Sequence, residues 1–261
     1  KYASKLEIPV FWFVAPQTWA WKESRVKLLE KYINKLYVIL PFEKKYFASK
    51  NISSEYFGHP LIEVIKDFPN QYSSRKKIIA LFPGSRKQEI RTMLPIMLKV
   101  TSYFRDYQFI IGGAKNIDIN FYKKIIKPSS VKIVFDQNYN LMNLASAALS
   151  TSGTVTLELA IHKVPQVVCY KTSLISFLIA KKLIKTKYIS LVNILSEKKV
   201  VDELIQNDFT LENLIMSLEK SLNKNNIEST VKDYKKLISK LNNQPVFNNI
   251  AKNIGSFLHE N

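Results

Sequence analysis

The chain has 261 residues with one cysteine and three histidines, and 46% of its residues are hydrophobic while 23% are charged. This balance is typical of a globular protein with one large or two smaller domains. It excludes an intrinsically disordered chain, a disulfide scaffold and a Cys-rich or His-rich metal site. The 39 Lys and Arg residues outnumber the 21 Asp and Glu residues, which gives a formal net charge of +18. Such a charge attracts phosphates, nucleic acids and anionic membrane surfaces. Lysines placed on solvated faces by a biased composition explain it equally well.

The sequence shows no targeting or membrane-spanning segment. No apolar run reaches the length of about 18 residues that a membrane-spanning helix needs. Residues 1–8 lack the apolar core of a secretory signal peptide. A reducing compartment fits a chain with a single cysteine. Because the sequence does not begin with Met, we expect it to start in the middle of a structure.

Predicted strands and helices alternate in the first part of the chain. The apolar run Ile8–Ala15 predicts a strand that is buried on both faces. Apolar residues then recur with a helical period from Ser24 to Leu36. The next predicted elements are a strand over 37–40, a helix over 42–50 and a strand over 55–57. Residues 61–76 are more polar, and we interpret them as an interdomain linker.

A second alternating series begins at Lys77. Its predicted strands are 78–82, 109–111, 131–135, 148–151 and 166–170, and its predicted helices are 87–105, 119–126, 141–147 and 153–162. Strands that alternate with helices predict a parallel α/β sheet with right-handed crossovers. From residue 173 onward we expect mainly helices, over 173–185, 210–222, 228–241 and 247–258.

Small, polar and glycine-bearing turns follow three of the predicted strands. These turns are Pro83–Arg86, Gly112–Ala114 and Thr151–Thr154. Ligands of parallel sheets bind beyond the carboxyl ends of the strands, so the three turns predict a binding site. In the third turn, Gly153 lets an anion approach the N–H groups at a helix start, and Ser152 and Thr154 add hydroxyl donors. Glu158, farther along that helix, can accept two sugar hydroxyls.

Arg86 is one of only five arginines in this lysine-rich chain. Its planar guanidinium can clamp phosphate oxygens in a way that lysine cannot. An ordinary solvated helix start, capped by Ser85 with Gln88 reaching back, explains the same turn about as well. A capped helix with a surface Glu158 is the corresponding alternative for the third turn. That turn lacks the lysine of a P-loop and the spacing of a dinucleotide-binding fingerprint, so neither motif is supported.

Six segments, taken in order, resemble motifs of the lipid-A-disaccharide synthase family. Three family segments, Pro-Gln-x-Trp-Ala-Trp-Lys-x-x-Arg-Val, Leu-Pro-Phe-Glu and Gly-His-Pro-Leu, match residues 16–26, 40–43 and 58–61. Three more, Pro-Gly-Ser-Arg-x-x-Glu-Ile, Ser-Gly-Thr-x-Thr-Leu-Glu and Lys-Tyr-Ile-Ser-Leu-x-Asn-Ile-Leu, match residues 83–90, 152–158 and 187–195. Each motif alone is weak, but the ordered set spans nearly the whole chain. The chain departs from the family at Val192 and Asp202, where proline is usual, and this concerns local loop shape only.

The resemblance implies an α/β fold of the GT-B type with two Rossmann-like parallel-sheet domains, the N-terminal one incomplete in this chain. It implies that residues 1–60 are a remnant of the N-terminal acceptor-binding domain and that residues 61–240 form the nucleotide-sugar-binding domain. Residues 241–261 are then a C-terminal helix that returns to the N-terminal domain. The proposed catalytic base of the family precedes the Pro-Gln-x-Trp segment. No catalytic residue is therefore assigned, and we expect this chain alone to be inactive.

The resemblance also implies an activity, that of a hexosyltransferase of lipid A biosynthesis in Gram-negative bacteria. Such an enzyme joins UDP-2,3-diacylglucosamine to 2,3-diacylglucosamine 1-phosphate with inversion, and it releases UDP. The implied diphosphate-binding residues are Arg86, Ser85, Ser152, Gly153 and Thr154, with Glu158 at the ribose and with Gln17 and Asn193 at the sugar or phosphate. No metal or other cofactor is expected, because Arg86 and the helix dipole can carry the charge. The expected partner is the anionic cytoplasmic face of the inner membrane, and a homodimer is left open.

Three alternatives stay open beside this interpretation. One is another GT-B enzyme of UDP-sugars, such as a UDP-GlcNAc epimerase or the murein glycosyltransferase, against which Trp19 and Trp21 argue. The second is a UDP-binding but inactive remnant of the synthase. The third is a nucleic-acid-binding protein, which the charge alone favours and which would bind with a steep salt dependence. We do not expect nucleic acid to be a partner.

Overall fold

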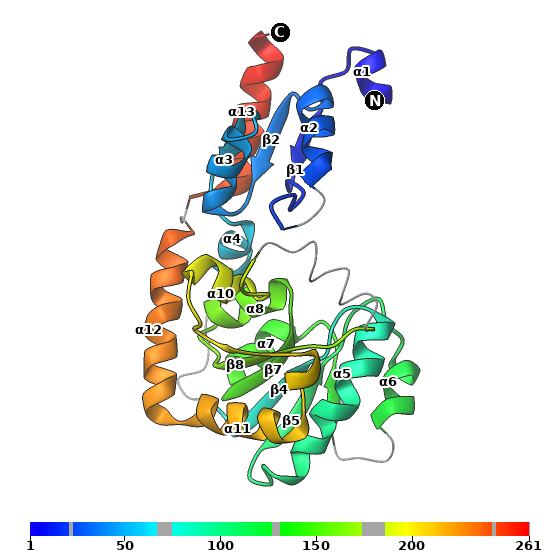
Figure 1. The fold of residues 1–261 in the computed structure, drawn as a ribbon, viewed down its shortest axis with the longest axis vertical. Coiled ribbons are helices and arrows are strands. Elements are labelled where there is room, and N and C mark those ends of the chain that lie inside the picture. Colours follow the sequence, from blue (N-terminus) through cyan, green and yellow to red (C-terminus); the bar gives the residue numbers. More distant parts are fainter. Residues whose placement is uncertain (21–22, 67–74, 127–130, 174–185, 242–243, 261) are drawn as a thin grey trace. The chain divides into compact units, whose positions relative to one another are not determined.

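The computed structural model describes residues 1–20, 23–66, 75–126, 131–173, 186–241 and 244–260 (Figure 1). The chain divides into two compact units. Unit 1 is formed by Lys1–Asp67, Leu178–Thr186 and Ile238–Asn261, and unit 2 by Phe68–Phe177 and Lys187–Leu237. Both units are built on parallel sheets.

Unit 1 contains a three-stranded parallel sheet in the order β1-β2-β3. Its strands are β1 (Phe11–Phe13), β2 (Lys35–Val38) and β3 (Ser54–Tyr56), and its helices are α1 (Tyr2–Lys5), the 3-10 turn η1 (Glu23–Arg25), α2 (Val26–Tyr32), α3 (Pro41–Ala48), α4 (Pro60–Lys66) and α13 (Val246–Glu260). The C-terminal helix α13 packs on the sheet through Val246 and Ile250, which contact Tyr37. The Tyr37 hydroxyl also donates a hydrogen bond to Asn253 Oδ1 over 2.9 Å.

The first predicted strand is shorter and more exposed than the sequence suggests. Only Phe11–Phe13 of the apolar run Ile8–Ala15 form β1. β1 is an edge strand, and the side chains of Trp12 and Phe13 are 43% and 39% exposed. The prediction of a strand buried on both faces is therefore wrong, because an apolar run does not reveal whether other elements cover both faces of the strand.

The predicted linker 61–76 is wrong in its first part. Pro60 begins α4, a position where proline needs no hydrogen-bond partner, and Ile62 and Ile65 of this helix are buried. The polar residues that follow this short helix in the sequence obscured its apolar positions. Residues 67–74 lie outside the described part of the chain.

Unit 2 contains a six-stranded parallel sheet in the order β6-β5-β4-β7-β8-β9. Its strands are β4 (Ile78–Phe82), β5 (Gln108–Gly112), β6 (Lys132–Val134), β7 (Ala147–Thr151), β8 (Gln166–Tyr170) and β9 (Asp202–Ile205). Its helices are α5 (Lys87–Lys99), η2 (Val100–Ser102), α6 (Ile119–Ile126), α7 (Asn138–Leu144), α8 (Thr154–Ile161), α10 (Leu191–Ser196), η3 (Gln206–Asp208), α11 (Leu211–Leu222) and most of α12 (Lys224–Lys240).

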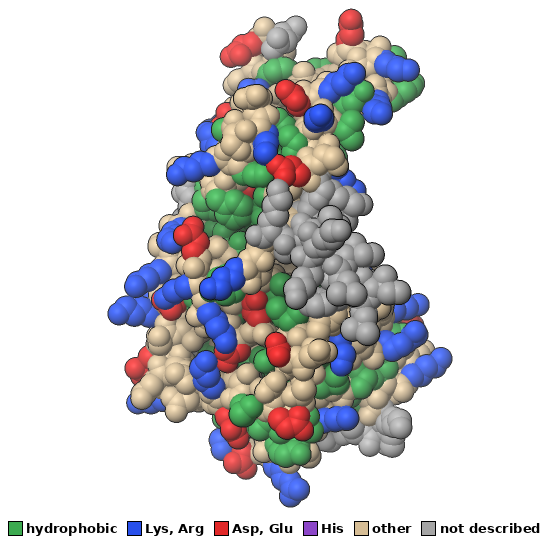
Figure 2. Space-filling model, viewed as in Figure 1, with side chains coloured by type: hydrophobic (Ala, Val, Ile, Leu, Met, Phe, Trp, Pro, Cys, Tyr) green, Lys and Arg blue, Asp and Glu red, His purple; other side chains and the backbone are tan. Residues whose placement is uncertain are grey.

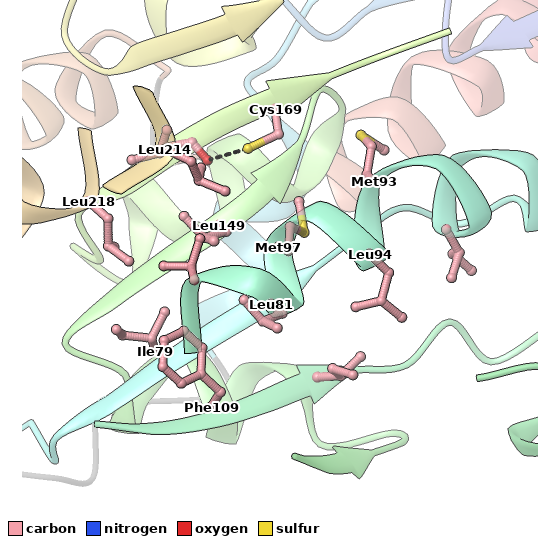
Figure 3. Packing of buried hydrophobic residues seen from close by; sticks show 14 of the residues in the cluster. Ile79, Leu81, Met93, Leu94, Met97, Phe109, Leu149, Cys169, Leu214 and Leu218 are labelled. Carbon is pink, nitrogen blue, oxygen red and sulfur yellow. Dashed lines mark hydrogen bonds between the residues drawn. The ribbon is translucent and has the colours of Figure 1, made fainter. Parts of the chain in front are cut away.

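Helices cover both faces of this sheet. Every residue of the central strands β4 and β7 is buried, as a parallel sheet covered on both sides requires. On one face, helices α5, α6 and α11 pack against the strands, and Figure 3 shows Met93 and Met97 of α5 in the same cluster as Leu81 and Leu149. On the other face, α7 and α8 pack against the sheet through Leu141, Met142 and Leu159.

The sequence predicts five strands of this sheet and misses the sixth. β9 and α10 lie in the stretch that was expected to be mainly helical. β9 pairs in parallel with β8, but only Leu204 of its four residues is buried. A strand this short and polar has no apolar run that sequence reasoning could detect. The predicted helix over 173–185 falls almost wholly on residues 174–185, outside the described part of the chain.

Arg75 ties together the C-terminal ends of α7 and α8. Its Nη1 donates hydrogen bonds to the carbonyl oxygens of Met142 and Ala145, and its Nη2 donates to the carbonyl oxygen of His162 over 2.7 Å. The last carbonyl groups of a helix have no partner within the helix and carry partial negative charge. The guanidinium satisfies such groups on two helices at once, so it fixes the two helices relative to each other.

His162 connects the same two helices through its ring. It follows α8, is 5% exposed, and its Nδ1 lies 2.7 Å from Oδ1 of Asn143 on α7. The ring also lies against that of Tyr139, with centroids 5.4 Å apart. Burial, with a smaller contribution from the positive charge of Arg75, lowers the pKa of His162 from 6.5 to about 4. The folded protein therefore keeps this histidine neutral well below neutral pH.

We expect the protein to lose stability on acidification through His162. Below about pH 6.5 the unfolded chain binds a proton that the folded state does not bind until about pH 4. The stabilising contribution is therefore complete above the unfolded pKa and is lost as the pH falls toward the folded one. At pH 5 the free energy of unfolding should be lower by about 2 kcal/mol for this one group.

Urea unfolding at pH 7 and pH 5 measures this effect. His162→Phe keeps an aromatic ring but cannot titrate, so its free energy of unfolding should fall by about 2 kcal/mol less than that of the parent. His259→Gln, at an exposed position of α13, is the control and should behave like the parent. Equal losses in the parent and in His162→Phe would contradict the assignment.

Candidate functional site

A cavity of about 480 Å³ lies at the carboxyl edge of the unit 2 sheet. β4 pairs with both β5 and β7, so the turns that follow these three strands meet at the same edge. The cavity is lined by Phe82, Gly84, Ser85, Arg86, Glu89, Gly112–Asn116, Asn138, Thr151–Val155 and Glu158. The structure therefore brings together the three turns that the sequence singles out, with all the residues predicted to bind diphosphate and ribose.

The turn after β7 leaves the N-terminal end of α8 open to the cavity. Gly153 is the N-cap residue, and no side chain caps this helix end. A Cβ at Gly153 would meet no atom within 4 Å, so the turn faces open space. Thr154 follows as the first, exposed residue of α8. Backbone N–H groups and the positive end of the helix dipole make this turn suited to binding an anion.

Ser152 lines the same turn but already uses its hydroxyl hydrogen. Its Oγ donates a hydrogen bond to the carbonyl oxygen of Ile189 over 2.7 Å. Ser152 therefore holds the segment 187–195 beside the turn, and in this state it has no hydrogen to offer an anion.

The turn after β4 is shaped by Gly84 and Glu89. Gly84 has a φ of +122°, and a Cβ there would lie 2.5 Å from Oε2 of Glu89. Glu89 Oε2 accepts hydrogen bonds from the N–H groups of Ser85 and Arg86, at 3.0 and 3.3 Å. The start of α5 is thus capped by Glu89, and the alternative with Ser85 as cap and Gln88 reaching back is wrong.

Arg86 stands at the mouth of the cavity with a weak internal partner. Its Nη1 lies 3.1 Å from Oε1 of Glu89, and its side chain is 81% exposed. Ion pairs this exposed contribute little to stability. The guanidinium can therefore leave Glu89 for an anion in the cavity at small cost.

Glu158 lies on α8 between two cavities. It lines the larger cavity and also an adjoining one of about 280 Å³, together with Lys115 and Asn138. Burial raises the pKa of its carboxyl group. In the part of the chain that the structure describes, the carboxylate makes no hydrogen bond or ion pair. A half-buried carboxylate without a partner is unfavourable, so it is suited to receive hydroxyl donors from a ligand.

The structure does not bring Asn193 to either cavity. Asn193 is completely buried. Its Nδ2 donates to the carbonyl oxygen of Val201 and to Oε1 of Glu203, both over 2.9 Å. Its Oδ1 accepts from the N–H groups of Val200 and Val201, at 2.8 and 3.0 Å. The side chain thus joins α10 to the start of β9 and has no free hydrogen-bonding group for a substrate.

Gln17 lies in unit 1 and is exposed, while Trp21 and Lys22 of the same motif lie outside the described residues.

The segment that contains Gln17 and Trp19 is held by Glu43, a completely buried carboxylate that sequence reasoning missed. Trp19 Nε1 donates to Oε1 of Glu43 over 2.8 Å, and the N–H groups of Ile39 and Leu40 donate to Oε2. One carboxylate therefore joins two of the motifs.

Two further lining residues, Lys115 and Asn138, were also missed. Lys115 follows β5 and forms an exposed ion pair with Asp136, with Nζ and Oδ1 2.6 Å apart. Asn138 begins α7, and its Oδ1 is buried without a hydrogen-bond partner. Their position after β5 and β6 is a signal that the sequence contained, since all strands of the sheet are parallel.

Neither a metal site nor a membrane-spanning helix is found in the described ranges. No group of three or more His, Cys, Asp and Glu side chains there is placed to hold a metal ion. Nor does any helix in these ranges have the length and apolar character needed to cross a membrane.

Solved structures with a similar fold bind UDP or UDP-sugars. A Staphylococcus aureus MnaA–UDP co-structure superimposes with a TM-score of 0.67 at 13% identity, covering 98% of this chain and 70% of that one. The UDP-GlcNAc 2-epimerase of Neisseria meningitidis, bound to UDP-GlcNAc, gives a TM-score of 0.55 at 17% identity, covering 99% and 71%. With the parallel sheets of both units, these likenesses confirm the predicted α/β fold of the GT-B type.

Sequence comparison gives the family. The profile of the lipid-A-disaccharide synthetase family matches residues 1–254. The lipid-A-disaccharide synthase of Coxiella burnetii (strain CbuG_Q212) is 33% identical over 276 residues, covering 99% of this chain and 71% of that protein. That of Syntrophus aciditrophicus (strain SB) is 36% identical over 219 residues, covering 78% and 57%. The chain belongs to the lipid-A-disaccharide synthase family.

Proposed function

We propose that unit 2 carries the nucleotide-sugar site of a glycosyltransferase of lipid A biosynthesis. The reaction joins UDP-2,3-diacylglucosamine to 2,3-diacylglucosamine 1-phosphate and gives lipid A disaccharide 1-phosphate and UDP, with inversion. Family membership supports the glycosyltransferase class and the lipid A pathway. The UDP and UDP-GlcNAc held by proteins of similar fold support a UDP-sugar as the donor.

The observation that carries this proposal is the pairing of an open helix start with an unpartnered carboxylate in one cavity. Gly153 and Glu158 lie on the same helix and line the same cavity. The N-terminal end of α8 suits a diphosphate, and the Glu158 carboxylate suits the two hydroxyls of a ribose. A nucleoside diphosphate has these two groups on neighbouring parts of one molecule.

The chemistry that these residues support is departure of UDP. When the bond between the sugar and the diphosphate breaks, negative charge develops on the leaving oxygen. The N–H groups at Gly153 and Thr154 and the guanidinium of Arg86 would stabilise this charge. Inversion also needs in-line attack by the acceptor hydroxyl and a base to take its proton. We assign the base to none of the residues that line the cavity.

The alternative function is that of another UDP-sugar enzyme of the same fold, for example a 2-epimerase. The solved structures that resemble this chain include such epimerases, but at 13% and 17% identity they indicate the fold alone. The family match over residues 1–254 and the Trp19–Glu43 pair, which joins two of the family's motifs, favour the synthase.

Separate substitutions should distinguish the ribose and phosphate parts of the site. Glu158→Gln should weaken uridine and UDP alike, because both carry the ribose. Arg86→Ala should weaken UDP and leave uridine nearly unchanged. A charge-assisted hydrogen bond contributes roughly 1.5–3 kcal/mol, so each loss should be about 10- to 150-fold in affinity. Isothermal titration of both ligands measures this.

Matched controls are available on the surface of unit 2. Glu219→Gln on α11 and Arg105→Ala after η2 remove the same groups at exposed positions away from the cavity. They should bind both ligands like the parent, and circular dichroism should show all variants folded. The site assignment fails if UDP binds folded Glu158→Gln and Arg86→Ala as tightly as it binds the parent.

We also propose peripheral association with the anionic cytoplasmic face of the inner membrane, where diacylated substrates reside. The support is the net charge of +18. Figure 2 shows basic side chains dispersed over the visible face among acidic and neutral ones, so on this face the positive charge is not gathered in one patch. Sedimentation should show binding to anionic vesicles that weakens as salt is added. Equal binding to neutral and anionic vesicles would contradict this.

A further inference from the structure

Three residues line both of the adjoining cavities of unit 2, and two of them, Lys115 and Asn138, have no role in the site described so far. The shared residues are Lys115, Asn138 and Glu158. The smaller cavity, of about 280 Å³, is completed by residues 136, 137, 139 and 140. Because Glu158 lies at the junction, a ligand whose diphosphate sits at Gly153 and whose ribose meets Glu158 can extend into the smaller cavity.

The amide of Asn138 is held at this junction without protein partners. Its Oδ1 is enclosed and accepts no hydrogen bond. Gly112, at the end of β5, makes room for it, because a Cβ there would lie 2.8 Å from that oxygen. Nδ2 is not enclosed in this way, and in the described part of the chain it makes no hydrogen bond. With Oδ1 against Gly112, the amide presents its N–H donors to the cavity.

The Nδ2 donor of Asn138 has no hydrogen-bond partner among the described residues, and Asn138 lines both cavities, so this donor is free to bind a ligand. Its neighbours do not supply the missing partner. Lys115 pairs with Asp136, and Tyr139 lies against the ring of His162. Asn138 also begins α7, whose far end is clamped by Arg75. The donor is therefore presented from a fixed helix and not from a loop.

We propose that Asn138 selects uracil as the base of the nucleotide, with Nδ2 donating a hydrogen bond to O4 of the ring. This proposal rests on the proposed UDP-sugar function. Uracil carries a carbonyl oxygen at position 4, where cytosine carries an amino group. The amide donor of Asn138 meets an acceptor in UDP and another donor in CDP. UDP and CDP have the same ribose and diphosphate groups. The contact between Asn138 and position 4 of the base should therefore decide which of the two binds more tightly.

Isothermal titration of UDP and CDP against three proteins tests the proposal. The parent should prefer UDP by about tenfold or more, because CDP places an amino donor opposite the Nδ2 donor and leaves both without an acceptor. Asn138→Leu should bind UDP about threefold to tenfold more weakly and should lose most of the preference. Asn138→Asp replaces the donor by an acceptor, so its ratio of CDP to UDP affinity should exceed that of Asn138→Leu. Asn120→Leu, at an exposed position of α6, is the control and should keep the parent's preference.

The ratio of the two affinities separates base reading from a structural role. If Asn138 only supports the fold, its substitution weakens UDP and CDP equally and the ratio stays that of the parent, which overturns the proposal. If the parent binds neither nucleotide, the proposed UDP-sugar function fails, and this inference fails with it. If the parent binds UDP and CDP equally well, the function stands and the role of Asn138 is rejected.

Discussion

The candidate site depends on a helix start that is firmly fixed and yet left uncapped. β7, which delivers the chain to this turn, is buried along its whole length between β4 and β8. At the far end of α8, Arg75 binds the carbonyl oxygen of His162. Ser152 fixes the turn from the side through Ile189. The hydrogen bonds of β7, of Arg75 and of the Ser152 hydroxyl are thus all made within the protein. The N-terminal end of α8 has no side-chain cap among the described residues and can still bind an anion.

The rest of the cavity lining likewise combines fixed backbone with side chains that are available to a ligand. Gly84 and Glu89 shape the turn after β4 and leave Arg86 with a partner that it can exchange. Glu158 and Asn138 are held on helices whose other ends are clamped, and neither side chain has a partner of its own in the described residues. Rigid backbone with unpaired polar side chains is the arrangement expected of a binding site, because the ligand then meets groups that are already in position.

Most of the site could be predicted from the sequence, for a reason that lies in parallel sheets. The turns at Gly84, Gly112 and Gly153 follow strands whose apolar runs are unmistakable, and parallel pairing brings their ends together. β9 was missed because a short polar strand at a sheet edge leaves no apolar run. Asn193 belongs to a family motif, but its amide is used up by Val200, Val201 and Glu203. A motif shows that a residue matters and does not show whether it acts on a ligand or on its own backbone.

The central claim is that the turn at Gly153 binds the diphosphate and that Glu158 binds the ribose of UDP. A crystal structure of the protein with UDP would test it most directly. The account predicts phosphate oxygens within hydrogen-bond distance of the N–H groups at Gly153 and Thr154, and ribose hydroxyls at the Glu158 carboxylate. UDP bound at another place would contradict it. One such place is the polar cavity beside Lys199 and Lys220, near Asp202 at the start of β9.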